Sequence, residues 1–246
     1  MSRVQSAVRW HTISAAALVV GLLAPAITPL QAQAAPTRKP TVAVIEFDIA
    51  AMVKKDEFAP MSVGIQVMLT SALAANPGIE LVERQKIQEI LAEQNLTTAG
   101  RIDPATAAKV GKILGARYVL LGAMVVDPSN EIRLETRAVN TETSAIEYTE
   151  GVRGKGDKVF KLIDDLAAKI NSGLKLPGIR VASSTTKELG TEGPNQLEAM
   201  KAMSSARRLE EQGDTKGAIA MYQKALALNS DLGVVKTRLA MLEAKK

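Results

Sequence analysis

Few side chains in this sequence have the types and the spacing that catalysis requires. Glu46 and Asp48 lie two apart in an apolar run, so they share one face of a strand and form a candidate carboxylate pair. No candidate base or metal ligand accompanies them, and two carboxylates at the solvent-facing end of a strand more often serve solubility. We therefore assign this pair no catalytic role.

A glycine-rich segment at residues 151–158 (GVRGKGDK) is a second candidate site. It leads into a helix, so its backbone amides and lysines have the character of an anion site. Its spacing does not match the phosphate-binding loop that ends in Lys-Ser or Lys-Thr, and a strand-to-helix turn is the commoner explanation. The sequence predicts neither a cofactor nor a metal site.

The N-terminal residues 1–34 have the three-part form of a secretory signal peptide. Arg3 and Arg9 give a basic start, residues 13–24 are apolar, and Ala32-Gln33-Ala34 supplies the small residues of a cleavage site. The apolar stretch is shorter than the roughly 20 residues that span a bilayer. We therefore predict cleavage before Ala35, with an uncleaved anchor as the alternative and no transmembrane helix in the mature chain.

Cleavage would remove the reactive side chains that matter most. His11 is the only histidine, Trp10 is the only tryptophan, and the chain has no cysteine. The trimmed chain would therefore lack zinc sites of imidazole and thiolate, Ser-His or Cys-His nucleophile pairs, and disulfides. These absences predict a protein that is not an enzyme.

Composition limits the class of partner. Apolar residues make up 46% of the chain and aromatic residues only 3%, so the core must be aliphatic. Loss of Arg3 and Arg9 lowers the formal charge from +5 to +3, and no long run of Lys and Arg remains. Nucleic acid is therefore not an expected partner.

Hydrophobic periodicity predicts an α/β (α+β) domain over residues 35–173. Asp103-Pro104 is a strong helix start and Gly115 a matching helix end, and we expect Gly173 to close the last helix. The central strands follow one another directly, which favours a mixed β-sheet with packed helices. The expected strands are 41–49, 79–82, 116–126, 131–140 and 145–152, and the expected helices are 58–72, 85–94, 103–115 and 160–170.

The rest of the chain divides into a linker and a helical module. Residues 174–196 carry Pro, Ser, Thr and Gly without apolar periodicity, which is typical of a linker. Residues 197–246 show helical periodicity throughout, over about 197–212, 215–228 and 232–244.

The first domain resembles the CsgG family of curli production assembly and transport components, including LpoB-like α/β domains. The likeness runs over about residues 41–171, through VAVIEF, LVERQKIQEILAEQ and DPATAAKVGKILGARYVLLGAMV. It implies a CsgG-like fold and a non-enzymatic role in envelope assembly or secretion. The chain departs from CsgG itself in having no lipid-bearing cysteine.

A membrane channel of the curli-secretion type is the alternative that this resemblance leaves open. Residues 131–140 and 145–154 are each near the roughly 9 to 11 residues that a membrane strand needs. The same strands are needed to complete the soluble sheet, and they lack the aromatic girdle of membrane strands. We therefore rank the channel second.

The C-terminal helices resemble a tetratricopeptide (TPR) repeat followed by a capping helix. Gln212-Gly213-Asp214 would form the turn, and Ala218, Tyr222 and Ala225 would occupy the packing positions. One repeat does not bury its apolar face alone, so we expect it to dock on the first domain or on another chain. The resemblance implies a groove lined from the first helix, although a solvated helix face is an equal alternative. The implied candidate partner-binding residues are Met200, Met203, Arg207, Glu210 and Glu211.

These expectations combine into one interpretation. The trimmed chain would be a periplasmic protein that binds other envelope proteins, with outer-membrane association and self-association both left open. The α/β domain would supply the association with the envelope, and the helical module would recruit a partner.

Overall fold

The computed structural model of the chain describes residues 38–51, 55–96, 102–177 and 195–244, and these described residues belong to one compact unit. The predicted signal peptide (1–34) lies outside the described residues, as does most of the predicted linker. The strands are β1 (Thr41–Val44), β2 (Asp48–Ala51), β3 (Glu80–Leu81), β4 (Tyr118–Val126), β5 (Glu131–Asn140) and β6 (Ile146–Lys155). The helices are α1 (Lys55–Phe58), α2 (Met61–Ala74), α3 (Arg84–Glu93), α4 (Pro104–Leu114), α5 (Val159–Gly173), α7 (Gln196–Glu211), α8 (Thr215–Leu228) and α9 (Gly233–Glu243).

The strands form one mixed sheet, so the predicted fold class is confirmed. Its order is β3-β1-β4-β5-β6, and β2 also pairs with β4. β1, β2 and β3 join the sheet in parallel, whereas β4, β5 and β6 form an antiparallel meander. The meander follows from the short polar connections between these strands, since neighbouring antiparallel strands need only a turn.

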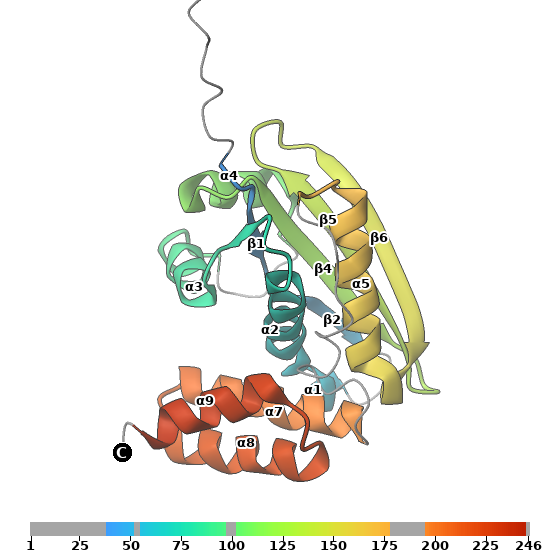
Figure 1. Cartoon of the computed structure of the whole chain (residues 1–246), viewed down its shortest axis with the longest axis vertical. Coiled ribbons are helices and arrows are strands. Elements are labelled where there is room, and N and C mark those ends of the chain that lie inside the picture. The colour runs from blue at the N-terminus through green and yellow to red at the C-terminus, as the bar shows by residue number, and fades with distance from the viewer. Residues whose placement is uncertain (1–37, 52–54, 97–101, 178–194, 245–246) are drawn as a thin grey trace, which may run out of the picture. The chain divides into compact units, whose positions relative to one another are not determined.

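Helices cover both faces of this sheet (Figure 1). α2 and α5 pack on one face in a cluster that includes Phe58, Leu69 and Ile163. α3 and α4 pack on the other face, where Ile87 and Val110 belong to a second cluster. Two buried layers therefore enclose the parallel part of the sheet, as such sheets require.

The first strand differs from the prediction of one continuous strand at 41–49. Val44 lies opposite Leu120 of β4, and Asp48 lies opposite Ala123, so four steps along the first strand match only three along β4. This extra residue is a bulge, and it reverses the alternation of faces. Strict alternation along one strand would place Phe47 on the face of Ala43 and Ile45, but its ring belongs to the cluster under α2.

A glycine makes room for that reversal. A Cβ atom at Gly122 of β4 would lie 2.2 Å from Cε1 of Phe47. The Phe47 ring therefore occupies space that any larger residue at position 122 would fill. Glu46 lies in the break between β1 and β2.

Local signals set the ends of α4 as predicted. The Asp103 side chain accepts hydrogen bonds from the backbone N–H groups of Ala105 and Thr106, at 2.9 and 3.0 Å. Gly115 ends the helix in the left-handed region, with φ of 68°. α5 differs slightly, because Gly173 is its last helical residue and the cap is Leu174.

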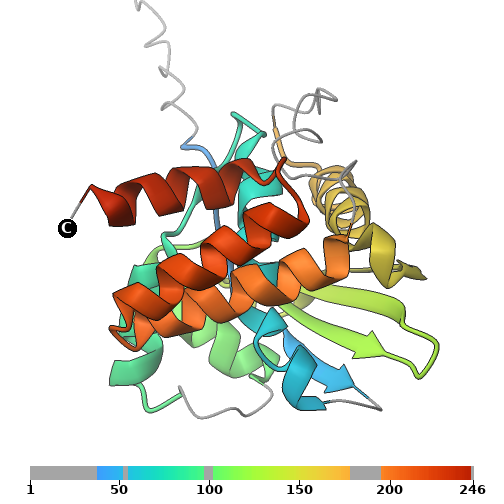
Figure 2. The ribbon, with the colours of Figure 1, turned by 90° about the horizontal axis from the view of Figure 1, so that it is seen from below.

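The three C-terminal helices form a layer of their own, seen from below in Figure 2. α7 and α8 pair across a turn at Gly213, whose φ of 84° favours glycine, and the Asp214 side chain accepts from Gly217 N at 2.9 Å. α7 also packs directly on α2. A Cβ atom at Gly64 of α2 would lie 2.0 Å from Ser204 Oγ of α7, so the two backbones approach closely. None of the described helices is long and apolar enough to cross a membrane.

Candidate partner-binding groove

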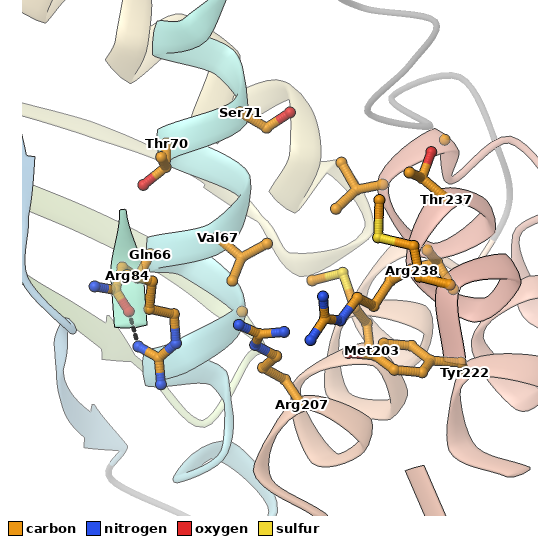
Figure 3. Close-up of a pocket in the computed structure, with 15 residues that line it drawn as sticks. Gln66, Val67, Thr70, Ser71, Arg84, Met203, Arg207, Tyr222, Thr237 and Arg238 are labelled. Carbon is orange, nitrogen blue, oxygen red and sulfur yellow. Dashed lines mark hydrogen bonds between the residues drawn. The ribbon is translucent and has the colours of Figure 1, made fainter. Parts of the chain in front are cut away.

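A groove of about 620 Å³ lies between α2 and the C-terminal helices. α2 supplies Val67 and Thr70 on one side, and α9 supplies Met241 on the other. Met203 of α7 and Tyr222 of α8 also line it, and Figure 3 shows these two side chains across the groove from Val67. The volume is within the range of specific ligand sites in proteins, about 300 to 1,000 Å³.

The groove lies beside the contact between α2 and α7, which among the C-terminal helices is the one that packs closely on α2. Gly64 lets α7 pack against α2, whereas α9 packs on α8. On α9, Val235 and Leu242 are buried, but Met241 on the rim is 51% exposed. A large apolar side chain therefore stands in solvent at the mouth of the groove.

Three arginines from three different helices line this space: Arg84, Arg207 and Arg238. Arg238 Nε donates to Glu210 at 3.1 Å, and its Nη2 donates to the same carboxylate. Arg84 donates to Glu211 from Nε and Nη2, at 3.0 and 2.5 Å. The Arg84–Glu211 pair ties α3 to α7, and the Arg238–Glu210 pair ties α9 to α7.

Glu46 connects this cluster to the sheet. It accepts hydrogen bonds from Arg84 Nη2 at 2.8 Å and from Arg208 Nη2 at 2.6 Å. It also accepts from Ser62 Oγ at 3.1 Å and from Gln88 Nε2 at 3.0 Å. The expectation that Glu46 faces solvent is therefore wrong: its side chain is 20% exposed and joins α2, α3 and α7.

These ion pairs set the charge of the carboxylates. Burial of Glu46 favours its neutral form, but the guanidinium groups of Arg84 and Arg208 outweigh burial and lower its pKa below the ordinary value. Burial likewise opposes ionisation of Glu210, and Arg238 and Arg207 lower its pKa overall. Both carboxylates are therefore ionised at neutral pH.

Tyr222 shares the carboxylate of Glu210, because its hydroxyl donates to Oε2 at 3.0 Å. Burial raises the pKa of Tyr222 to about 12, and the negative charge of Glu210 adds to this shift. The phenol therefore stays neutral and acts as a hydrogen-bond donor, not as a base.

The five predicted partner-binding residues occupy different positions in this arrangement. Met203 and Arg207 line the groove. Glu210 and Glu211 lie behind it and hold the arginines. Met200 is fully buried against Gly64, so it presents no surface to a partner.

Sequence reasoning missed Arg84, Arg208 and Arg238. The only sequence signal was the placement of Arg84 directly after a strand and at the start of a helix. In the part of the chain that the structure describes, no group of three or more His, Cys, Asp or Glu residues is placed to hold a metal ion.

Comparison with known proteins gives a family match for part of the chain. Residues 24–126 match the sequence profile of the family described as curli production assembly/transport component CsgG. No curated protein sequence matches the chain.

Several solved structures are similar at low identity. The C-terminal domain of LpoB from Salmonella enterica is 18% identical with a TM-score of 0.39, and the match covers 48% of this chain and 83% of that one. Lipoprotein GNA1162 from Neisseria meningitidis is 13% identical with a TM-score of 0.41, over 55% of this chain and 98% of that one. PelC from Paraburkholderia phytofirmans is 18% identical with a TM-score of 0.34, and the match covers 56% of this chain and 90% of that one. Over residues 24–126, the chain is thus similar to the CsgG family of curli production assembly/transport components.

Proposed function

We propose that this protein is a non-enzymatic assembly factor of the bacterial cell envelope that binds another protein in the groove between α2 and α9. The lining of that groove is the observation that carries the proposal. It combines Arg207, Arg238, Tyr222, Met203 and Met241, and Arg, Tyr and Met are the residue types enriched at protein interfaces.

The chemistry of the lining favours binding over catalysis. Its arginines are always charged and cannot act as bases near neutral pH, and its tyrosine is held neutral. Thr70, Ser71 and Thr237 are its aliphatic hydroxyl side chains, and none of the described lining residues is a histidine, cysteine, lysine or carboxylate that would activate them. The match to the CsgG family supports the setting in envelope assembly.

The proposal also includes the signal peptide, the periplasmic setting and the division into domains that the sequence predicts. Cleavage after residue 34 would release the chain into the periplasm, where it would bind other envelope proteins or a second copy of itself. The chain would consist of a CsgG-like domain (35–173), a linker (174–196) and a TPR-like module with a capping helix (197–246). The CsgG-like domain would associate with the envelope, and Met203 and Arg207 of the TPR-like module would contact the partner.

Photo-crosslinking in the bacterial cells that make the protein tests this function. A crosslinking amino acid replaces Met241 at the groove rim, and a matched chain carries it at Ile113 of α4, which is similarly exposed at 46%. We expect one discrete heavier adduct from position 241 and none from position 113. Equal adducts from both positions, or none from 241, would contradict a partner site in the groove.

A channel subunit of the curli-secretion type is the second candidate. β5 and β6 have 10 residues each, the length that suits a membrane strand, and the matched family includes transport components. The exposed side chains of Arg133 and Arg153 on these strands make it the weaker proposal. A channel must co-sediment with the outer membrane and conduct ions in planar bilayers, whereas we expect neither.

A further inference from the structure

One end of the sheet collects exposed basic side chains from four separate segments of the chain. β1, β3 and β4 begin at this end, and α4 and α5 finish there, whereas the C-terminal helices lie at the opposite end (Figure 1). We call this part of the molecule the basic end. Its exposed cations are Arg38, Lys39, Lys109, Lys112, Arg117 and Lys175.

Backbone contacts and helical spacing bring these segments together. Arg117 N donates to Thr41 O at 2.7 Å, so Arg117 lies beside the start of β1 and close to the two cations that precede this strand. Lys109 lies three and four positions before Lys112 and Ile113, so these three side chains share the exposed face of α4. The basic end is therefore one continuous surface.

The cations of the basic end are not neutralised within the chain. Among the described residues, none of them forms an ion pair with a carboxylate, and Arg117 contacts the ring of Tyr118, 5.5 Å from its centroid. Elsewhere on the surface arginines are paired, as Arg133 is with Glu135. Six cations therefore outnumber the three carboxylates at this end, which leaves an excess of three positive charges. Those carboxylates are Glu80, Glu142 and Glu147.

Two large apolar side chains are exposed to solvent at the same end. Ile113 of α4 is 46% exposed, and Ile146 at the start of β6 is 43% exposed. Ile146 lies opposite Val139, which belongs to the cluster under α4, so both isoleucines lie on the α4 side of the sheet. Removing such side chains from water is favourable, so they suit a partner with an apolar interior.

The combination of free cations and exposed isoleucines matches the surface of an anionic bilayer. Negatively charged headgroups attract Lys and Arg side chains that come close to the membrane surface. Lys and Arg keep their charged ends in water at the headgroups, while apolar side chains beside them enter the acyl boundary. The cations are spread over a whole end of the molecule and none of them lines the groove, so they fit an extended surface better than a small anion.

We infer that the basic end binds the surface of a membrane that contains anionic phospholipid. Lys109, Lys112 and Arg117 would contact the headgroup phosphates, and Ile113 and Ile146 would insert between the headgroups. The groove would then face away from the bilayer, toward its protein partner. The two surfaces are separate, so either one can fail its test without the other.

Cosedimentation with lipid vesicles tests this binding. The chain from residue 35 onward contains all of the described residues, which belong to one compact unit. It is mixed with vesicles of phosphatidylethanolamine and phosphatidylglycerol, or with neutral vesicles in which phosphatidylcholine replaces the phosphatidylglycerol. We expect at least about tenfold tighter binding to the anionic vesicles at about 0.1 M salt. Most of this preference should disappear at about 1 M salt, where the screening length falls from about 10 Å to about 3 Å.

Paired lysine variants connect the binding to the basic end. Lys109→Gln with Lys112→Gln should weaken binding to the anionic vesicles at least about fivefold, because each lysine near the surface contributes to the attraction. The matched control is Lys216→Gln with Lys224→Gln, which removes two exposed lysines of α8 at the opposite end of the molecule. The control pair should leave binding unchanged.

Single tryptophan probes report which surface meets the lipid. The only tryptophan of the sequence is Trp10, so the chain from residue 35 onward has none. Ile113→Trp should show a blue shift of its fluorescence with anionic vesicles, whereas Met241→Trp at the groove rim should show none.

Three results would overturn the inference: equal binding to anionic and neutral vesicles, equal weakening by the α4 and α8 lysine pairs, or the same spectral response from positions 113 and 241. Absence of vesicle binding together with a discrete protein adduct from position 113 in cells would also overturn it, and would assign the basic end to an acidic protein.

Discussion

Neutralising Glu46 tests whether the ion-pair cluster holds the C-terminal helices to the sheet. The Glu46→Gln variant keeps the size and one acceptor oxygen but loses the charge that faces Arg84 and Arg208. Hydrogen bonds to charged groups contribute roughly 1.5 to 3 kcal/mol each, and breaking a fully buried pair costs about 3 to 5 kcal/mol. Because the Glu46 side chain is 20% exposed, we expect a loss near the low end, about 3 kcal/mol at pH 7.

Urea denaturation followed by circular dichroism measures this loss. With an m value of about 2 kcal/mol/M, the midpoint should fall by roughly 1.5 M. The matched control is Glu135→Gln, whose partner Arg133 is exposed, and it should cost less than about 1 kcal/mol.

The pH dependence of the same variant supplies a second reading. The pKa of Glu46 is lower in the folded chain than its ordinary value of 4.5. The ionised group therefore stabilises the fold above pH 4.5, and this contribution disappears as the pH falls through the lowered pKa. The difference in free energy of unfolding between wild type and Glu46→Gln should therefore become smaller as the pH falls through that acidic range. A gap below about 0.5 kcal/mol at pH 7, or one that does not change with pH, would refute the reasoning.

Three further predictions concern packing and titration. Gly64→Ala places a Cβ atom 2.0 Å from Ser204 Oγ and should cost about 1 to 3 kcal/mol in urea denaturation, with partial rescue by Ser204→Ala; an unchanged midpoint would contradict the close α2–α7 contact. Gly122→Ala places its Cβ 2.2 Å from the Phe47 ring and should cost a similar amount, about 1 to 3 kcal/mol, with rescue by Phe47→Leu; no rescue would contradict the close Gly122–Phe47 contact. Ultraviolet absorbance titration should show a tyrosine that ionises near pH 12 and is absent from Tyr222→Phe, and persistence of that phase in the variant would contradict the assignment.

Features that depend on neighbouring residues could be predicted from the sequence. The Asp103 cap, the left-handed Gly115 and the β4–β6 meander all follow from residues within one element or its turn. The break in the first strand could not be predicted, because it depends on Gly122 of β4, which makes room for Phe47. The residues of the segment 41–49 contain no local sign of a bulge.

In the candidate site too, some residues could be predicted from the sequence, whereas contacts between residues far apart in the chain could not. Met203 and Arg207 could be selected because the TPR resemblance implies a groove lined from the first helix, and both lie in the groove lining. The Glu46–Arg208 contact joins residues 162 positions apart, and no periodicity encodes such a distance. Met200 was selected through the same resemblance as Met203 but is buried, since Gly64 on α2 allows a close approach at that point.

Hydrogen–deuterium exchange of the purified chain, with and without the partner recovered through position 241, measures partner binding in the groove most directly. We predict slower amide exchange at residues 64–71 of α2 and 233–241 of α9 when the partner is bound, and no change along β6. Unchanged exchange in both helices, with protection along β6 instead, would contradict the account.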